Sequence, residues 1–123
     1  MAEKKKKAGP FGVELIMDIQ GCDPKVLKSK QQLGKFCRGL AKQVGTKTFG
    51  KAIVHRFGKE HLEGNSALQF IEASSITVHC CEMRNAAYIN LFSCIDFDYK
   101  KAEDYCRKFF GGAKARATVI ERN

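Results

Sequence analysis

The stretch VELIMDIQGCDP, residues 13–24, contains a strand, a sharp break and the start of a helix. Apolar side chains occupy every second position from Val13 to Ile19, a period of two that predicts a strand with one buried face. Gly21 interrupts this pattern. Asp23 can cap a helix and Pro24 suits the first helical position, so a helix is expected to follow the strand directly.

The helix is expected to extend to about residue 43, because apolar residues continue at helical spacing. These residues are Leu33, Phe36, Cys37, Leu40 and Val44. Two apolar stretches, residues 49–57 and 67–71, then predict neighbouring strands joined by a loop at the polar segment 58–65.

A second hairpin is predicted from residues 75–79 and 87–94, which are rich in β-branched and aromatic residues. Residues 99–110 have helical composition and end at a glycine pair that begins at Gly111, and residues 115–120 predict a last strand. The resulting order is β-α-β-β-β-β-α-β. It predicts an α+β fold, a two-layer α/β sandwich in which two helices cover one face of a mainly antiparallel sheet.

The composition predicts a single domain over residues 11–123, after a basic flexible tail at residues 1–10. No apolar run approaches the roughly 20 residues that span a bilayer, and no apolar segment of a secretory signal follows the N-terminal lysines, so a cytoplasmic protein without membrane contacts is expected. The net charge of +9 raises the hypothesis of nucleic-acid binding. Charge is its only support, so no nucleic-acid partner is expected, and the excess could equally attract an acidic substrate or partner.

Six cysteines could suggest a disulfide scaffold, but their spacings are irregular and a secreted context is missing, so mostly free thiols are expected. Cys80 and Cys81 adjoin His79. Zinc sites normally use spaced ligands, however, and adjacent strand residues point to opposite faces. No metal site is therefore expected.

Reactive side chains are densest from Ser74 to Glu82, with Ser66 upstream and Cys94 downstream. Serine and threonine alternate naturally on the solvent face of a strand, so the residue types alone leave both catalysis and a purely structural role open.

Four segments, residues 18–24, 54–57, 66–79 and 86–94, together resemble the short bacterial and archaeal S-adenosylmethionine decarboxylases. The resemblance runs in order from about residue 13 onward, with one short insertion near residues 58–65. It implies that the chain cleaves itself and converts a serine into a pyruvoyl cofactor.

The resemblance implies roles for individual residues. The hydroxyl of Ser74 would attack the carbonyl of Ala73 and turn the peptide bond between them into an ester. His79 would remove the Ser74 α-proton so that β-elimination breaks the chain, while Ser66 would hydrogen-bond the intermediate. The pyruvoyl group left at residue 74, formed with loss of ammonia, would make a Schiff base with the substrate amine. Cys94 would then reprotonate the carbon from which carbon dioxide leaves.

Two further residues are implied to bind substrate. Phe57 is expected to stack on adenine or to face a sulfonium, and Glu82 lies one position from the family's ribose-binding glutamate. The chain departs from the family in three places: Ala73 stands where glutamate is usual, Ser75 where histidine is usual, and residues 80–83 replace Thr-Trp-Pro-Glu.

Strand geometry adds an expectation about assembly. Five strand residues of about 3.3 Å each would put Ser74 and His79 roughly 16 Å apart, facing opposite ways. One chain cannot easily join them, but a two-fold dimer can, with Ser66 and His79 of one protomer meeting Ser74 and Cys94 of the other. A homodimer with two shared sites is therefore expected.

The leading hypothesis is a self-processing, pyruvoyl-dependent decarboxylase that acts on S-adenosylmethionine and supplies the aminopropyl donor for polyamine (spermidine) synthesis. The changed residues after His79 leave a second hypothesis open, in which the same cofactor acts on arginine or ornithine. A third hypothesis is an unprocessed paralogue that binds or regulates an active partner.

Overall fold

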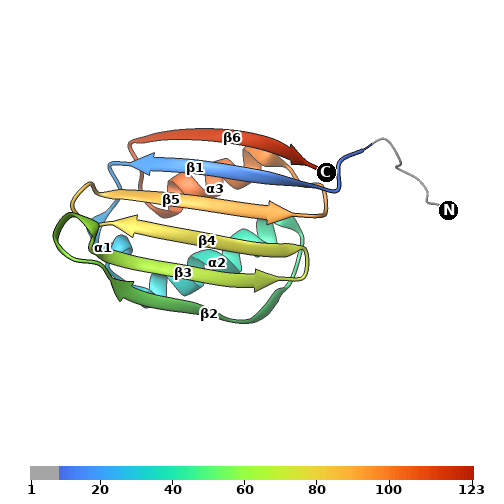
Figure 1. Ribbon diagram of the computed structural model, residues 1–123. Helices are drawn as coiled ribbons and strands as arrows, with labels where there is room; N and C mark the ends of the chain where they lie inside the picture. The colour runs from blue at the N-terminus through green and yellow to red at the C-terminus, as the bar shows by residue number, and fades with distance from the viewer. Residues whose placement is uncertain (1–8) are drawn as a thin grey trace.

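The computed structural model describes residues 9–123 (Figure 1). The strands are β1 (Gly12–Gln20), β2 (Thr48–Phe57), β3 (Gly64–Ile71), β4 (Ser74–Cys81), β5 (Ala86–Ser93) and β6 (Lys114–Arg122). The helices are α1 (Pro24–Leu27), α2 (Lys30–Val44) and α3 (Tyr99–Phe109), with a short 3-10 helix η1 (Glu60–Leu62). Of the basic tail expected over residues 1–10, residues 1–8 lie outside the described part of the chain.

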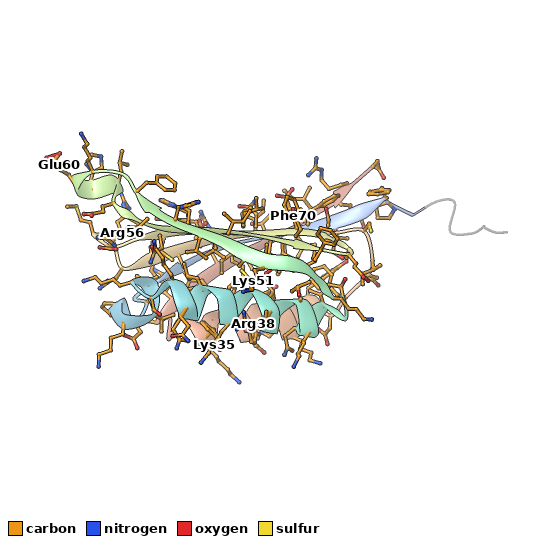
Figure 2. All side chains as sticks on the ribbon, turned by 90° about the horizontal axis from the view of Figure 1, so that it is seen from below. Lys35, Arg38, Lys51, Arg56, Glu60 and Phe70 are labelled. Atoms are coloured by element: carbon orange, nitrogen blue, oxygen red, sulfur yellow. The ribbon has the colours of Figure 1, made fainter. Side chains whose placement is uncertain are left out.

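All six strands join one antiparallel sheet in the order β2-β3-β4-β5-β1-β6. Both long helices lie on the same side of this sheet, and the opposite side, here called the open face, carries neither of them (Figure 2). The predicted α+β sandwich is therefore confirmed. Figure 2 also shows Phe70 of β3 on the open face and Lys35 of α2 pointing away from the sheet.

The core lies between the sheet and the helices. On β1, Leu15, Met17 and Ile19 are at most 1% exposed, because alternate residues of the strand face the helix layer. The Phe36 ring of α2 packs with its centroid 4.8 Å from that of Phe110. Burial of this apolar surface supplies most of the stabilisation of the two layers.

The single helix predicted after Asp23 is in fact two helices. The Asp23 side chain caps α1 by accepting from the Lys25 amide at 3.0 Å. Ser29 then has an extended backbone, with φ of −102° and ψ of 111°, and its hydroxyl accepts from the Gln32 amide at 3.1 Å. The sequence prediction missed this second cap, which ends α1 and starts α2.

Strand β3 begins earlier than predicted, at Gly64 instead of residue 67. Asn65 is buried, and its amide donates to the Leu27 carbonyl at 3.1 Å, which ties the start of β3 to α1. The buried Gln69 amide donates to the Gly50 carbonyl at 3.0 Å, at the irregularity of β2. Both buried side-chain amides therefore form hydrogen bonds to backbone carbonyls of neighbouring segments and fix their positions.

Positive charge is concentrated in one segment of the chain. Residues 24–59 contain ten of the 22 lysines and arginines and none of the 13 acidic residues. In Figure 2, Lys35 and Arg38 of this segment lie on the outer surface of α2. These two basic side chains therefore lie on the side of the molecule away from the open face.

All six cysteines are free thiols, and only Cys94 is exposed. Burial raises the pKa of Cys37 and of Cys80 to about 12 and that of Cys22 to about 11, because a thiolate is poorly solvated in the core. Cys106, which is fully buried, has its pKa raised for the same reason. These core thiols stay protonated and are poor nucleophiles.

Alkylation should therefore distinguish Cys94 from the other cysteines. Iodoacetamide at about pH 8 should modify one thiol per native chain, since alkylation needs an accessible thiolate. Mass spectrometry of the intact protein gives the count, and Cys94→Ser should reduce it to none. Modification of a second cysteine in the native protein would contradict the burial of the other five.

The contact between α2 and α3 predicts opposite effects for two glycine substitutions. A Cβ at Gly39 would overlap the Tyr105 hydroxyl, which donates to the Phe36 carbonyl at 3.0 Å. Gly39→Ala should lower the free energy of unfolding by about 1–3 kcal/mol. At Gly34 the nearest atom is Arg38 Nη1 at 3.5 Å, so Gly34→Ala should raise it by up to about 1 kcal/mol through helix propensity. Urea denaturation measures the free energy of unfolding of both variants. If both substitutions changed it in the same direction, the close approach of Tyr105 to Gly39 would be refuted.

Candidate functional site

Ser66 and His79 form a pair on the open face. They lie directly opposite each other in the register of β3 and β4, and Ser66 Oγ is 2.6 Å from His79 Nδ1. Both side chains are partly buried. The flanking residues Val78 and Cys80 point into the core, which fixes the backbone that carries the imidazole. A hydroxyl and an imidazole in hydrogen-bond contact can together accept or relay a proton.

This pair lines a hollow of about 350 Å³ on the open face. The residues around it come from four neighbouring strands: Ile53, His55, Phe57, Ser66, Ala67, Leu68, Thr77, Val78, His79, Tyr88 and Asn90. The Phe57 ring centroid lies 6.4 Å from that of His79. The hollow is mainly apolar and aromatic, and none of its lining residues is an aspartate or glutamate.

A second group of predicted residues meets at the turn between β3 and β4. Ala73 is buried in this turn, and its amide donates to Thr46 Oγ1 at 3.1 Å. Its carbonyl accepts from the Cys94 amide at 3.0 Å. Ser74 follows at the start of β4, opposite Ser93 of β5. The predicted cleavage position and Cys94 are therefore in direct backbone contact, although they are far apart in the sequence.

The four predicted catalytic positions thus fall into two pairs within one protomer. Ser74 and His79 lie five residues apart on the same strand, so the alternation of β4 turns their side chains to opposite faces. Ser66 accompanies His79 in the hollow. Cys94 accompanies Ser74 and lines a different groove, of about 260 Å³, between β1 and the start of α3.

Of the two predicted substrate residues, one lines the hollow and one does not. Phe57 is on its wall and is 57% exposed. Glu82 lies outside it, in the turn after β4, and its carboxylate accepts two hydrogen bonds from the Arg56 guanidinium, that from Nη2 at 3.0 Å. Arg56 also pairs with Glu63 at 2.8 Å. The Glu82 carboxylate could contact a ligand only by sharing or giving up Arg56.

The structure adds Thr46, Tyr88 and Asn90 to the residues near these two regions. Tyr88 and Asn90 alternate along a predicted strand, so their shared face could have been recognised in the sequence. Thr46 could not, because its contact with Ala73 joins segments that meet only in the folded chain.

Two further properties concern ligands and membranes. Within residues 9–123, no cluster of three or more histidine, cysteine, aspartate or glutamate side chains is arranged to hold a metal ion. None of the helices described is long and apolar enough to cross a membrane.

Known proteins share this sequence pattern and fold. The family model described as S-adenosylmethionine decarboxylase matches residues 13–123. An S-adenosylmethionine decarboxylase proenzyme of Clostridium botulinum strain Langeland is 30% identical over 98 residues, 79% of this chain and 81% of that protein. One from Clostridium kluyveri is 26% identical over 113 residues, 91% of this chain and 86% of that protein.

A solved structure agrees with these matches. The adenosylmethionine decarboxylase from Aquifex aeolicus superimposes with a TM-score of 0.80 at 19% identity, covering 94% of this chain and 93% of that chain. At this identity the likeness shows a shared fold. The family match over nearly the whole described chain, together with the relative at 30% identity, shows that this protein belongs to the S-adenosylmethionine decarboxylase family.

Proposed function

We propose that this chain cleaves itself between Ala73 and Ser74, carries a pyruvoyl group derived from Ser74, and decarboxylates S-adenosylmethionine to supply the aminopropyl donor for polyamine synthesis. The observation that carries the proposal is the hydrogen bond from the Cys94 amide to the Ala73 carbonyl, at 3.0 Å. It places a fixed donor on the carbonyl that must be attacked.

That donor suits the first step of cleavage. When the Ser74 hydroxyl attacks the Ala73 carbonyl carbon, negative charge develops on the carbonyl oxygen. A fixed backbone N–H aimed at such an oxygen stabilises it without reorganisation. The C–N bond then breaks, Ala73 becomes esterified to Ser74 Oγ, and the Ser74 nitrogen becomes a free amine.

The second step needs a base at the Ser74 α-carbon, and His79 is the proposed base. Its Nδ1 contacts the Ser66 hydroxyl, so this contact orients the ring and leaves Nε2 to take the proton. Loss of the α-proton expels Ala73 as a carboxylate through cleavage of the Cβ–O bond. Tautomerisation and hydrolysis of residue 74 consume one water and release ammonia.

The hollow favours S-adenosylmethionine over arginine or ornithine. A pyruvoyl group, once formed, withdraws electrons from a substrate amine joined to it and so favours loss of carbon dioxide. A guanidinium or ammonium side chain would call for a carboxylate partner, and no lining residue supplies one. Phe57 and Tyr88 instead offer aromatic surfaces for an adenine ring and a sulfonium.

We also propose that two copies pack open face to open face and share their sites. Five large apolar side chains are exposed on this face: Phe49, Ile53, Phe57, Phe70 and Ile120. An exposed apolar surface of this kind fits a protein interface. Within one protomer the Ser74 side chain is turned away from the open face, so a two-fold partner would have to present its Ser74 and Cys94 from the end of its sheet, at the β3–β4 turn, to reach the Ser66–His79 pair.

Self-cleavage is tested by the mass of the purified protein. Two fragments are expected, residues 1–73 and residues 74–123, the second lighter by one ammonia than the same peptide beginning with serine. Ser74→Ala should leave the chain intact, because no hydroxyl remains to attack. A wild-type chain that stays intact and is not labelled by carbonyl-reactive hydrazides would refute the proposal.

Turnover is tested by release of labelled carbon dioxide from S-adenosylmethionine, arginine and ornithine, each carboxyl-labelled. Release is expected from S-adenosylmethionine, while cleaved Cys94→Ala should lose at least about 100-fold in kcat if the thiol donates the proton. Release from arginine or ornithine alone would favour the second hypothesis. Full turnover by Cys94→Ala would remove the thiol from the reaction.

Shared sites are tested by co-expressing two inactive chains with different tags. Ser74→Ala and His79→Ala should each remain uncleaved when expressed alone. In the mixed dimer, the His79→Ala chain should be cleaved, because its Ser74 meets His79 of the partner chain. If the mixed dimer forms and no cleavage occurs, the sites are not shared in this way.

A further inference from the structure

We propose that Thr46 is a positioning residue for self-cleavage, which holds the peptide before Ser74 in the conformation that is attacked. The inference rests on the proposed self-cleavage. It comes from a contact between the loop joining α2 to β2 and the turn joining β3 to β4. Thr46 Oγ1 lies 3.1 Å from the Ala73 amide nitrogen and accepts its hydrogen bond.

The turn is held from two sides. In the α2–β2 loop, the Lys47 carbonyl accepts from the Glu72 amide at 2.9 Å, and the Thr46 hydroxyl accepts from the next amide, that of Ala73. On the other side, the Cys94 amide donates to the Ala73 carbonyl at 3.0 Å. Both polar backbone groups of Ala73 are therefore paired, which fixes the orientation of the peptide on each side of its α-carbon.

The residue at position 73 makes these backbone contacts more important. The methyl group of alanine forms no hydrogen bond, so the side chain of residue 73 cannot itself hold the peptide in place. Ala73 is only 4% exposed, so its orientation depends on packing and on the contacts of its backbone.

With the peptide fixed, rotation of the Ser74 side chain is the main motion needed to bring its hydroxyl to the carbonyl carbon. Holding two reacting groups near their attack geometry lowers the barrier of an intramolecular reaction. Thr46 does not touch the reacting atoms itself. It acts through the Ala73 amide, on the acyl shift and not on the elimination that follows.

The test follows cleavage of the full-length chain over time after cell-free synthesis. Thr46→Val keeps the shape of the side chain but removes the acceptor, and it should slow cleavage by about tenfold, the effect of losing one positioning hydrogen bond. Thr46→Ser keeps the hydroxyl and should stay within about twofold of wild type. Thr48→Val is the matched control, because it makes the same substitution nearby in β2 and should cleave at the wild-type rate.

Hydroxylamine, which cuts esters, separates the two chemical steps. His79→Ala should accumulate an ester that hydroxylamine cleaves, whereas Thr46→Val should accumulate the uncut peptide, which resists it. The effect of the Thr46 substitution on the turn itself is measured in the Ser74→Ala chain, which cannot be cleaved. There, Thr46→Val should speed hydrogen exchange at the Ala73 amide, and Thr48→Val should not.

Cleavage of Thr46→Val at the wild-type rate would overturn this assignment alone. So would equal slowing by Thr46→Ser and Thr48→Val, an accumulated ester in Thr46→Val, or unchanged exchange at Ala73. A wild-type chain that is never cleaved would overturn the proposed function and this assignment with it. The two failures are therefore distinguishable.

Discussion

The antiparallel pairing of β3 with β4 is the constraint on which the candidate site depends. Its register places Ser66 opposite His79 and leaves Ala73 in the connecting turn. Because side chains alternate along a strand, a slip of one residue would turn the imidazole into the core and separate it from the hydroxyl. The buried residues Ile76 and Val78 make such a slip costly, since it would expose them.

The helix layer contributes to the site through the segments that follow it. Packing of α2 against the sheet fixes where its C-terminal loop emerges, and that loop carries Thr46 to the Ala73 amide. The end of β5 brings the Cys94 amide to the same residue from the other side. A turn at the end of a hairpin would otherwise be one of the less restrained parts of a small domain. Here it is held from two sides, by the α2–β2 loop and by the residue that follows β5.

The two faces of the sheet have different surroundings. One is buried under helices and has Lys35 and Arg38 on the outer surface of α2, and the other exposes apolar and aromatic side chains around Ser66 and His79. Lys35 and Arg38 therefore lie on the side away from the candidate site. Arg116 and Arg122, on the open face, are paired with Asp18 and Glu14. For this reason the net charge of +9 is a poor guide to what binds in the hollow.

Much of this protein was determined by local patterns in the sequence. The alternation from Val13 to Ile19 and the helical spacing after Pro24 predict the layers, because burial of apolar side chains follows periodicity. The spacings of Ser66, Ser74, His79 and Cys94 carry the resemblance to the family. The cap that divides α1 from α2 was missed, since many serines resemble caps and only the fold selects one.

Tertiary structure alone decided which of these residues meet. Three sets of contacts join segments that are distant along the chain: Ser66 with His79, Arg56 with Glu82, and the hydrogen bonds on either side of Ala73. No local periodicity of the sequence encodes such contacts.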